Sequence, residues 1–214
     1  MTYTGDVTAG GPADVRDLPG LTISKIEVGD FGNNAYLLRC RETGDGVLID
    51  AANDAPRLLE LIGDRPISKI ITTHRHPDHW MALAEVAKET GAETIAHPLD
   101  APELPVPVTR PVEHGARVSV GVATIEVIHL RGHTPGSIAL LYQDGHLFTG
   151  DSLFPGGVGN TQGDAARFDQ LYTDVVERVF DRLPDTTWVY PGHGKDTTLG
   201  AERPALPEWR ARGW

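Results

Sequence analysis

Short runs of apolar and β-branched residues, bounded by turn residues, recur along most of the chain and predict β-strands. The first run is LTISKIEV, from Leu21 to Val28, followed by NAYLLRC, from Asn34 to Cys40, and GVLID, from Gly46 to Asp50. Further runs of this kind predict strands over Ile67 to Thr73, Thr94 to His97, Arg117 to Val120, Ala123 to Leu130, Ser137 to Gln143, His146 to Gly150 and Thr187 to Tyr190.

Apolar residues at helical spacing predict helices between these strands. The segment from Asp54 to Ile62 starts with Asp, carries a Pro in its first turn and is followed by Gly63, a residue that commonly ends helices. The segment from Asp78 to Gly91 closes on a glycine in the same way, and a longer helix is predicted from about Ala166 to Leu183.

The strands fall in two groups, and helices come late in each group. This order fits two mixed sheets packed face to face with helices outside, an α+β fold with a four-layer αββα sandwich, although the pattern alone does not distinguish it from another α/β arrangement. A chain of 214 residues with 40% hydrophobic content is long enough for one large core, so we expect a single domain over residues 21–214. Residues 1–20 are rich in Gly and Thr and are predicted to form a mobile N-terminal arm.

Composition narrows the classes of partner and compartment. The formal net charge is -11, which repels nucleic acids and anionic membranes, so we expect neither as a partner. The first residues show no basic start followed by an apolar stretch, and no apolar run is long enough for a membrane helix. Cys40 is the only cysteine, which excludes an internal disulfide and leaves a buried small side chain as its expected role. We therefore expect a cytoplasmic protein.

The segment THRHPDHW carries the strongest chemical signal in the chain. In an extended backbone His74 and His76 point the same way, and Pro77 disfavours helix at His76, so both imidazoles can reach one ion. Asp78 and His79 follow at the start of the predicted helix and can face a second ion. Imidazole and carboxylate groups are good ligands for zinc-like metals, so the segment predicts a metal site rather than a solvated loop.

Later segments each add one candidate ligand beside a predicted strand end. RGHTPGS contains His133, FTGDSLF contains Asp151 and YPGHGKD contains His193. Each residue alone is ambiguous, because a His or Asp before a turn is often structural. The remaining histidines fit no ligand pattern and are expected at the surface or in the core; they are His97, His114, His129 and His146.

Taken together, these segments resemble the metallo-β-lactamase superfamily, whose pattern is H-x-H-x-D-H followed by a single His, an Asp and a last His. GHTPGS, TGDSLF and YPGHG make the resemblance strongest to the glyoxalase II-like branch. The resemblance covers Leu21 to Gly194 and implies two adjacent divalent ions, zinc or alternatively iron or manganese. It assigns His74, His76 and His133 to one ion. It assigns Asp78, His79 and His193 to the other, with Asp151 bridging both.

The glyoxalase II-like resemblance implies hydrolysis of a small-molecule thioester, a hydroxyacyl-thiol, by a metal-bound hydroxide. Paired divalent ions make such a hydroxide available near neutral pH, and Asp78 is a candidate to accept a proton during catalysis. The sequence departs from the branch at Asn160, where members often have Arg or Lys. The only cations near the C-terminus are Arg203, Arg210 and Arg212, so glutathione is not established as the thiol.

Other functions fit the same residues. A persulfide dioxygenase would hold one iron through His74, His133 and Asp151, because two imidazoles and one carboxylate suit non-haem iron. An ester or lactone hydrolase would use the same scaffold and ions as a thioesterase. A non-catalytic metal-binding module is disfavoured, because every ligand position of the pattern is filled.

Overall fold

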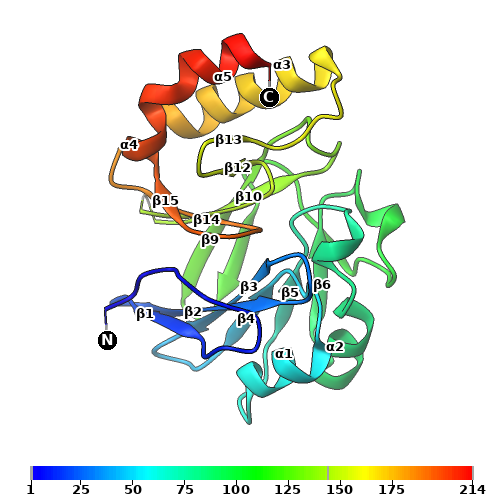
Figure 1. The fold of residues 1–214 in the computed structure, drawn as a ribbon. Helices are drawn as coiled ribbons and strands as arrows, with labels where there is room; N and C mark the ends of the chain where they lie inside the picture. The colour runs from blue at the N-terminus through cyan, green and yellow to red at the C-terminus, as the bar shows by residue number, and fades with distance from the viewer. Residues whose placement is uncertain (1, 144, 214) are drawn as a thin grey trace.

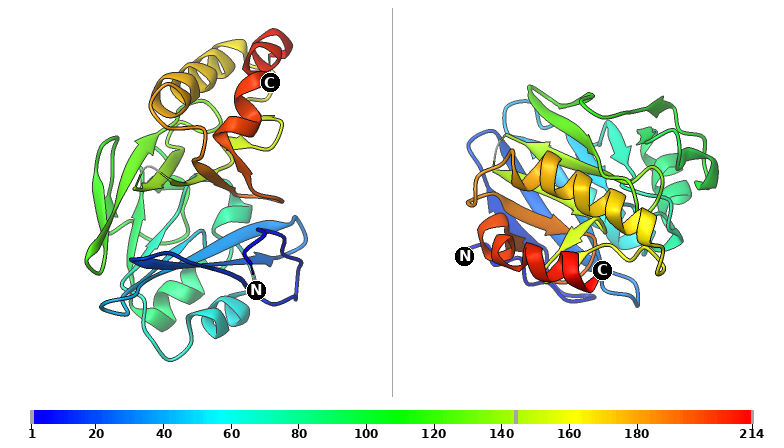
Figure 2. Two further views of the ribbon diagram at one scale, coloured as in Figure 1. Left: turned by 90° about the vertical axis from the view of Figure 1, so that its left-hand side faces the viewer. Right: turned by 90° about the horizontal axis from the view of Figure 1, so that it is seen from above.

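The computed structural model describes residues 2–143 and 145–213, and in that part of the chain two main β-sheets pack face to face with helices on their outer sides (Figure 1). The turned views show the same order of layers, with the first sheet and its helices on one side and the second sheet and its helices on the other (Figure 2). The predicted α+β fold with an αββα sandwich is confirmed.

The first sheet joins the early strands of the chain in sequential order. Its strands are β1 (Asp14–Asp17), β2 (Leu21–Val28), β3 (Asn33–Cys40), β4 (Gly46–Ile49), β5 (Lys69–Ile71), β6 (Glu93–Ala96) and β7 (Arg110–Pro111). Neighbours from β1 to β4 are antiparallel, and neighbours from β4 to β7 are parallel.

The second sheet runs in the order β15-β14-β11-β10-β9-β8. Its strands are β8 (Arg117–Val120), β9 (Ala123–His129), β10 (Ile138–Tyr142), β11 (His146–Gly150), β14 (Trp188–Pro191) and β15 (Thr197–Thr198). The β11 and β14 strands are parallel and the other neighbours are antiparallel. A small separate ribbon pairs β12 (Leu153–Phe154) with β13 (Gly157–Val158).

Helices cover the outer face of each sheet. Those beside the first sheet are α1 (Ala55–Ile62) and α2 (Leu83–Thr90); those beside the second are α3 (Ala165–Val175), α4 (Leu199–Glu202) and α5 (Leu206–Arg212) (Figure 2). Short helical turns complete the chain: η1 (Pro77–His79), η2 (Ala101–Glu103) and η4 (Arg203–Ala205) are 3₁₀ turns, and η3 (Val176–Phe180) continues α3 as a π-helical turn.

The core follows from alternation along the strands. In β2, Leu21 and Ile23 face the layer between the two sheets, whereas Ile26 and Val28 face the layer shared with α1 and α2. A third apolar layer lies between the second sheet and its helices. Cys40 is 1% exposed in the layer between the sheets, which confirms its expected role as a buried small side chain.

The helix predicted to start at Asp78 begins later, at Leu83. Residues Pro77–His79 form the η1 turn instead. The reason lies in the backbone amides of Met81 and Ala82, which donate to carbonyls of the segment after β4 and so cannot continue a helix. This arrangement fixes the segment THRHPDHW against the first sheet before the helix starts.

The N-terminal segment differs from the mobile arm predicted for residues 1–20. Its residues Asp14–Asp17 form β1 and pair antiparallel with β2. Further upstream, the hydroxyl of Tyr3 donates to Asp196 at 2.6 Å, and its ring packs at the edge of the core between the sheets. The prediction failed because the anchoring contacts come from residues far away in sequence.

The C-terminal tail was not predicted to be helical, yet it forms α4, η4 and α5. Trp209 anchors α5, since its side chain is 1% exposed and packs edge to face against Phe180 at 6.3 Å between ring centroids. Trp214 lies outside the described residues. Among the residues that are described, no helix combines the length and hydrophobicity needed to span a bilayer.

Candidate metal centre

The predicted ligands lie in loops that leave strands of both sheets. His74, His76, Asp78 and His79 follow β5, whereas His133 follows β9 in the other sheet. Asp151 follows β11, and His193 follows β14. Because β11 and β14 are parallel neighbours, their carboxyl ends bring the last two segments to the same edge. The structure thus gathers all seven predicted residues into three overlapping groups, which are His74, His76 and His133; His74, His79 and Asp151; and Asp78, His79 and His193.

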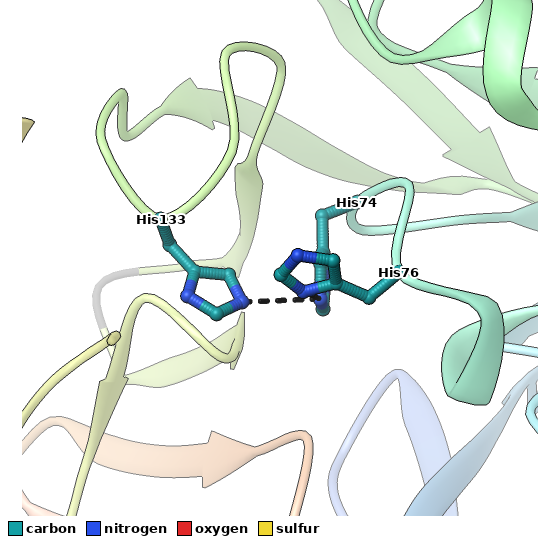
Figure 3. Close-up of side chains that lie close together, drawn as sticks. All are labelled: His74, His76 and His133. Carbon is teal, nitrogen blue, oxygen red and sulfur yellow. Dashed lines mark hydrogen bonds between the residues drawn. The ribbon is translucent and has the colours of Figure 1, made fainter. Parts of the chain in front are cut away.

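One cluster consists of His74, His76 and His133. Nε2 of His74 lies 3.1 Å from Nδ1 of His76 and 3.3 Å from Nε2 of His133. Figure 3 shows the three rings converging from two loops, one carrying His133 and the other carrying His74 and His76. One nitrogen from each ring lies within 4.8 Å of the other two, a spacing that a single cation can fill.

The second cluster consists of Asp78, His79 and His193. Nε2 of His193 lies 3.2 Å from Nε2 of His79 and 3.2 Å from Oδ2 of Asp78. Their potential ligand atoms also lie within 4.8 Å of one another. His79 is fully buried, whereas the side chains of Asp78 and His193 are about one third exposed, at 30% and 33%. This cluster therefore has an open side toward solvent.

Asp151 lies between the two clusters. Its Oδ2 is 3.7 Å from Nε2 of His133 and 3.5 Å from Nε2 of His193, so one carboxylate reaches both clusters. Its Oδ1 is buried and has no hydrogen-bond partner, although Nε2 of His79 is 3.3 Å away. Gly192 leaves room for the Asp151 carboxylate, because a Cβ at residue 192 would stand 2.3 Å from Oδ1 of Asp151.

The titration behaviour of these groups differs between the clusters. Burial lowers the pKa of His74 well below its usual range and lowers the pKa of His133 to about 4. Burial also opposes the charging of His79, but Asp151 and Asp50 outweigh it and raise the pKa of His79 to about 10. For Asp151, burial acts to raise the pKa, but His79 and His193 lower it well below its usual range. The carboxylate is therefore held in its anionic, ligand-competent form.

Asp50 orients the imidazole ring of His79 through its Nδ1 atom. Its Oδ2 lies 2.9 Å from Nδ1 of His79, and its carboxylate accepts hydrogen bonds from the amide and hydroxyl of Thr73. Asp50 is itself 2% exposed. A carboxylate on the outer nitrogen of an imidazole fixes the tautomer and leaves Nε2 free to bind a cation.

The loop of His133 is held by two polar side chains from other elements. Asp100 accepts hydrogen bonds from the hydroxyl of Thr134 and from the amide of Arg75, and so connects this loop to the one carrying His74 and His76. On the other side, Arg167 of α3 donates to the carbonyls of Gly132 and His133. These contacts set the backbone position of the first cluster.

Contacts from the β2–β3 turn and from the first residue of β3 hold the second cluster. Nδ2 of Asn33 donates to Oδ2 of Asp78 at 3.0 Å, and Asn33 forms an isolated β-bridge with His193. Nδ1 of His193 lies 2.9 Å from the carbonyl of Phe31. Phe31 in the turn and Asn33 at the start of β3 therefore set the position of both partly exposed members of this cluster.

Sequence reasoning missed these supporting residues, which are Asn33, Asp50, Asp100 and Arg167. A signal existed for Asp50, because it directly follows β4, the neighbour of the strand before THRHPDHW. The other contacts join segments far apart in sequence, so no local pattern reveals them. The histidines not predicted as ligands lie outside the clusters within the described residues. Among them, His97 and His129 stack at 3.9 Å between ring centroids.

The donor set suits divalent cations. Imidazole nitrogens brought within about 3.3 Å of each other need a shared proton or a cation between them, and the partnerless Oδ1 of Asp151 points to the same conclusion.

The family comparison agrees with this geometry, because the metallo-β-lactamase superfamily model matches residues 28–193. The chain belongs to the metallo-β-lactamase superfamily. It therefore shares the fold of a superfamily of metal-dependent hydrolases, and the clusters described above lie in the matched segment.

Both sequence relatives and solved structures are similar to this superfamily member. A hydroxyacylglutathione hydrolase from Rhodospirillum rubrum is 39% identical over 75% of this chain, which spans 62% of that relative's length. Among solved structures, TTHA1623 in a di-iron-bound form has a TM-score of 0.73 and 34% identity, covering 84% of this chain and 96% of its own. ETHE1 from Myxococcus xanthus has a TM-score of 0.75 and 29% identity, covering 88% and 84%.

Proposed function

We propose that the protein is a thioesterase that hydrolyses a small acyl-thiol substrate with two divalent metal ions, zinc in the first instance. The observation that carries this proposal is the convergence of three overlapping groups of ligand atoms, in which Oδ2 of Asp151 lies 3.7 Å from Nε2 of His133 and 3.5 Å from Nε2 of His193. His74, His76 and His133 would hold one ion. Asp78, His79 and His193 would hold the other. The similarity to a hydroxyacylglutathione hydrolase supports the thioester as the substrate class.

When bound, a pair of divalent ions activates water near neutral pH and polarises the acyl carbonyl. The chain's own residues determine how the reaction proceeds around them. Asp78 lies on the open side of the site, and Asn33 holds its Oδ2 at 3.0 Å. Burial acts to raise the pKa of Asp78, but His79 and Asn33 lower it below its usual value, so it stays ionised. We assign to Asp78 the transfer of a proton from water.

The test is hydrolysis of a panel of thioesters, esters, lactones and phosphodiesters by enzyme of known metal content. We expect thioester cleavage that disappears on chelation and returns when zinc is restored. Two zinc ions per chain would support the proposed stoichiometry. Failure of the loaded enzyme to cleave any carbonyl substrate would refute the hydrolase proposal.

A mononuclear iron persulfide dioxygenase is the second candidate, because a second ligand set can be drawn from the same residues. Nε2 of His74 and Nε2 of His133 lie 4.0 and 3.7 Å from Oδ2 of Asp151, which gives two imidazoles and one carboxylate. One iron per chain together with oxygen uptake on a persulfide would favour this function. Two zinc ions with thioester cleavage would favour the hydrolase.

A further inference from the structure

Two apolar hollows share His193 as a lining residue. The first, called here the Phe154 hollow, has a volume of ≈ 540 Å³ and is lined by Asp151, Phe154, Pro155 and Pro191 besides His193. The second, called the Met81 hollow, has a volume of ≈ 560 Å³ and is lined by Phe31, Pro77, Asp78 and Met81 besides His193. Both volumes fall in the range of small-molecule sites, about 300 to 1,000 Å³.

The wall of the Met81 hollow exposes large apolar side chains to solvent. Phe31 is 70% exposed and Met81 is 55% exposed, next to the ligand candidates Asp78 and His193. Exposed apolar surface of this kind, gathered beside a reactive centre, is typical of a surface that a ligand covers. Because His193 lines both hollows, a ligand that occupies both of them would pass beside the candidate metal centre.

Few positively charged side chains line the two hollows among the described residues. Among the described residues that line the two hollows, Lys195 is the only Lys or Arg, and its Nζ lies 3.2 Å from Oδ1 of Asp6. Asn160 contributes its backbone, because its carbonyl lies 3.0 Å from Nδ1 of His133. Its side-chain Oδ1 accepts the amide of Gln162 and so turns back into its own loop. A thiol carrying several carboxylates would therefore lose hydration with few cations to receive it.

We propose that the substrate is an uncharged thioester with an apolar acyl group and an apolar thiol, one in each hollow. This inference rests on the proposed thioesterase function. In the reaction, the water oxygen bonds to the acyl carbon, the carbon–sulfur bond breaks and a proton from water passes to the sulfur. The products are a carboxylic acid and a free thiol, so no oxidant or further reactant is needed.

The test crosses two acyl groups with two thiols. Lactoyl and hexanoyl thioesters are made with glutathione and with benzyl mercaptan, and kcat/KM is measured for zinc-loaded enzyme. We expect hexanoyl benzyl mercaptan to be cleaved at least 100-fold more efficiently than lactoylglutathione, with the change of acyl group and the change of thiol each contributing. Equal or better cleavage of the glutathione thioesters would overturn the inference while leaving the thioesterase function intact. If none of the four is cleaved, both fail.

A binding measurement gives an answer that does not depend on turnover. By titration calorimetry on the zinc-loaded protein, hexanoate should bind at least tenfold more tightly than lactate, because an apolar chain gains from burial in a hollow. Equal affinities, or tighter binding of lactate, would contradict the inference.

Variants then test which hollow binds the acyl group and which binds the thiol group. Phe154→Ala should reduce kcat/KM for hexanoyl benzyl mercaptan about tenfold, and Met81→Ala should do the same through the other hollow. For one of the two alanine variants, the decrease in kcat/KM should disappear when the acyl group is shortened. For the other variant, it should disappear when the thiol group is shortened. Val122→Ala removes a side chain that is 61% exposed outside both hollows and serves as the matched control. Phe154→Leu guards against a folding defect, since it keeps an apolar group in place. Unchanged kinetics in both alanine variants would refute the assignment.

Discussion

Lys25 and Asp196 form an ion pair in which both side chains are fully buried, with Nζ and Oδ1 2.6 Å apart. The same ammonium group donates to the carbonyls of Gly5 and Gly194, and Asp196 accepts hydrogen bonds from Tyr3 and Trp188. One buried charge pair thus ties β2, the N-terminal segment and the loop after His193 together.

Replacing Lys25 by Met should destabilise the fold strongly. The change leaves Asp196 buried without its cation, and breaking a buried pair in this way costs about 3 to 5 kcal/mol. Unfolding in urea, followed by fluorescence, measures the loss. The double variant Lys25→Met with Asp196→Asn is the matched control and should recover part of it, because no uncompensated charge remains. A single variant as stable as the wild type would show that the pair does not support the structure.

Asp50→Asn should weaken metal binding at the second cluster. The amide removes the negative charge that orients His79 through Nδ1, and loss of such a partner typically lowers affinity about 10- to 100-fold. Competition with a chelator measures the affinity. Asp54→Asn is a close control, because Asp54 shares the positive φ of Asp50, at 52° against 55°, but is exposed at the start of α1. Equal affinities in the two variants would argue against a positioning role for Asp50.

Arg167→Met should instead affect the first cluster. Its guanidinium group holds the carbonyls of Gly132 and His133, so its loss frees the loop of one ligand and should lower metal affinity about tenfold. Arg210→Met is the comparison, because Arg210 contacts α3 through Asp169 without touching that loop. Chelator competition applies again. The prediction fails if both arginine variants retain wild-type affinity.

His146 should make stability depend on pH. Burial and the charge of Arg16 lower the pKa of His146 from 6.5 to about 4. Between these values the unfolded chain binds the proton and the folded chain does not, so the free energy of unfolding falls as the pH drops from 6.5 toward 4. The ring is partly exposed to solvent, which reduces its share to on the order of 1 kcal/mol.

The variant His146→Gln measures that share. It can still hydrogen-bond to Tyr190, whose hydroxyl lies 2.9 Å from Nδ1 of His146, but it cannot take up a proton in this range. Urea unfolding at pH 7, 6, 5 and 4 should show the variant gaining stability relative to the wild type as the pH falls. Parallel stability curves would contradict this prediction.

Much of the fold could be predicted because alternation along a strand is a local property. The strands at Leu21–Val28, Arg117–Val120 and His146–Gly150 have the predicted boundaries. The tail helix around Trp209 could not be predicted in this way, because its stability comes from packing against Phe180. The strand β1 likewise depends on pairing with β2 rather than on its own residues.

The candidate ligands could be found from sequence because His and Asp residues cluster in short motifs, and the resemblance to a known family assigned these residues to two ions. The residues that hold the ligands in position could not be found in this way. Asp100 connects the loops of His74 and His133 across the two sheets, and Asn33 meets His193 across 160 residues. Ordinary Asn and Asp residues give no signal until the fold brings them to the site.

Anomalous diffraction from crystals of zinc-loaded protein tests the metal centre most directly. Two peaks are expected beside Asp151, one among His74, His76 and His133 and the other among Asp78, His79 and His193. A single peak, or peaks away from these side chains, would contradict the two-ion site.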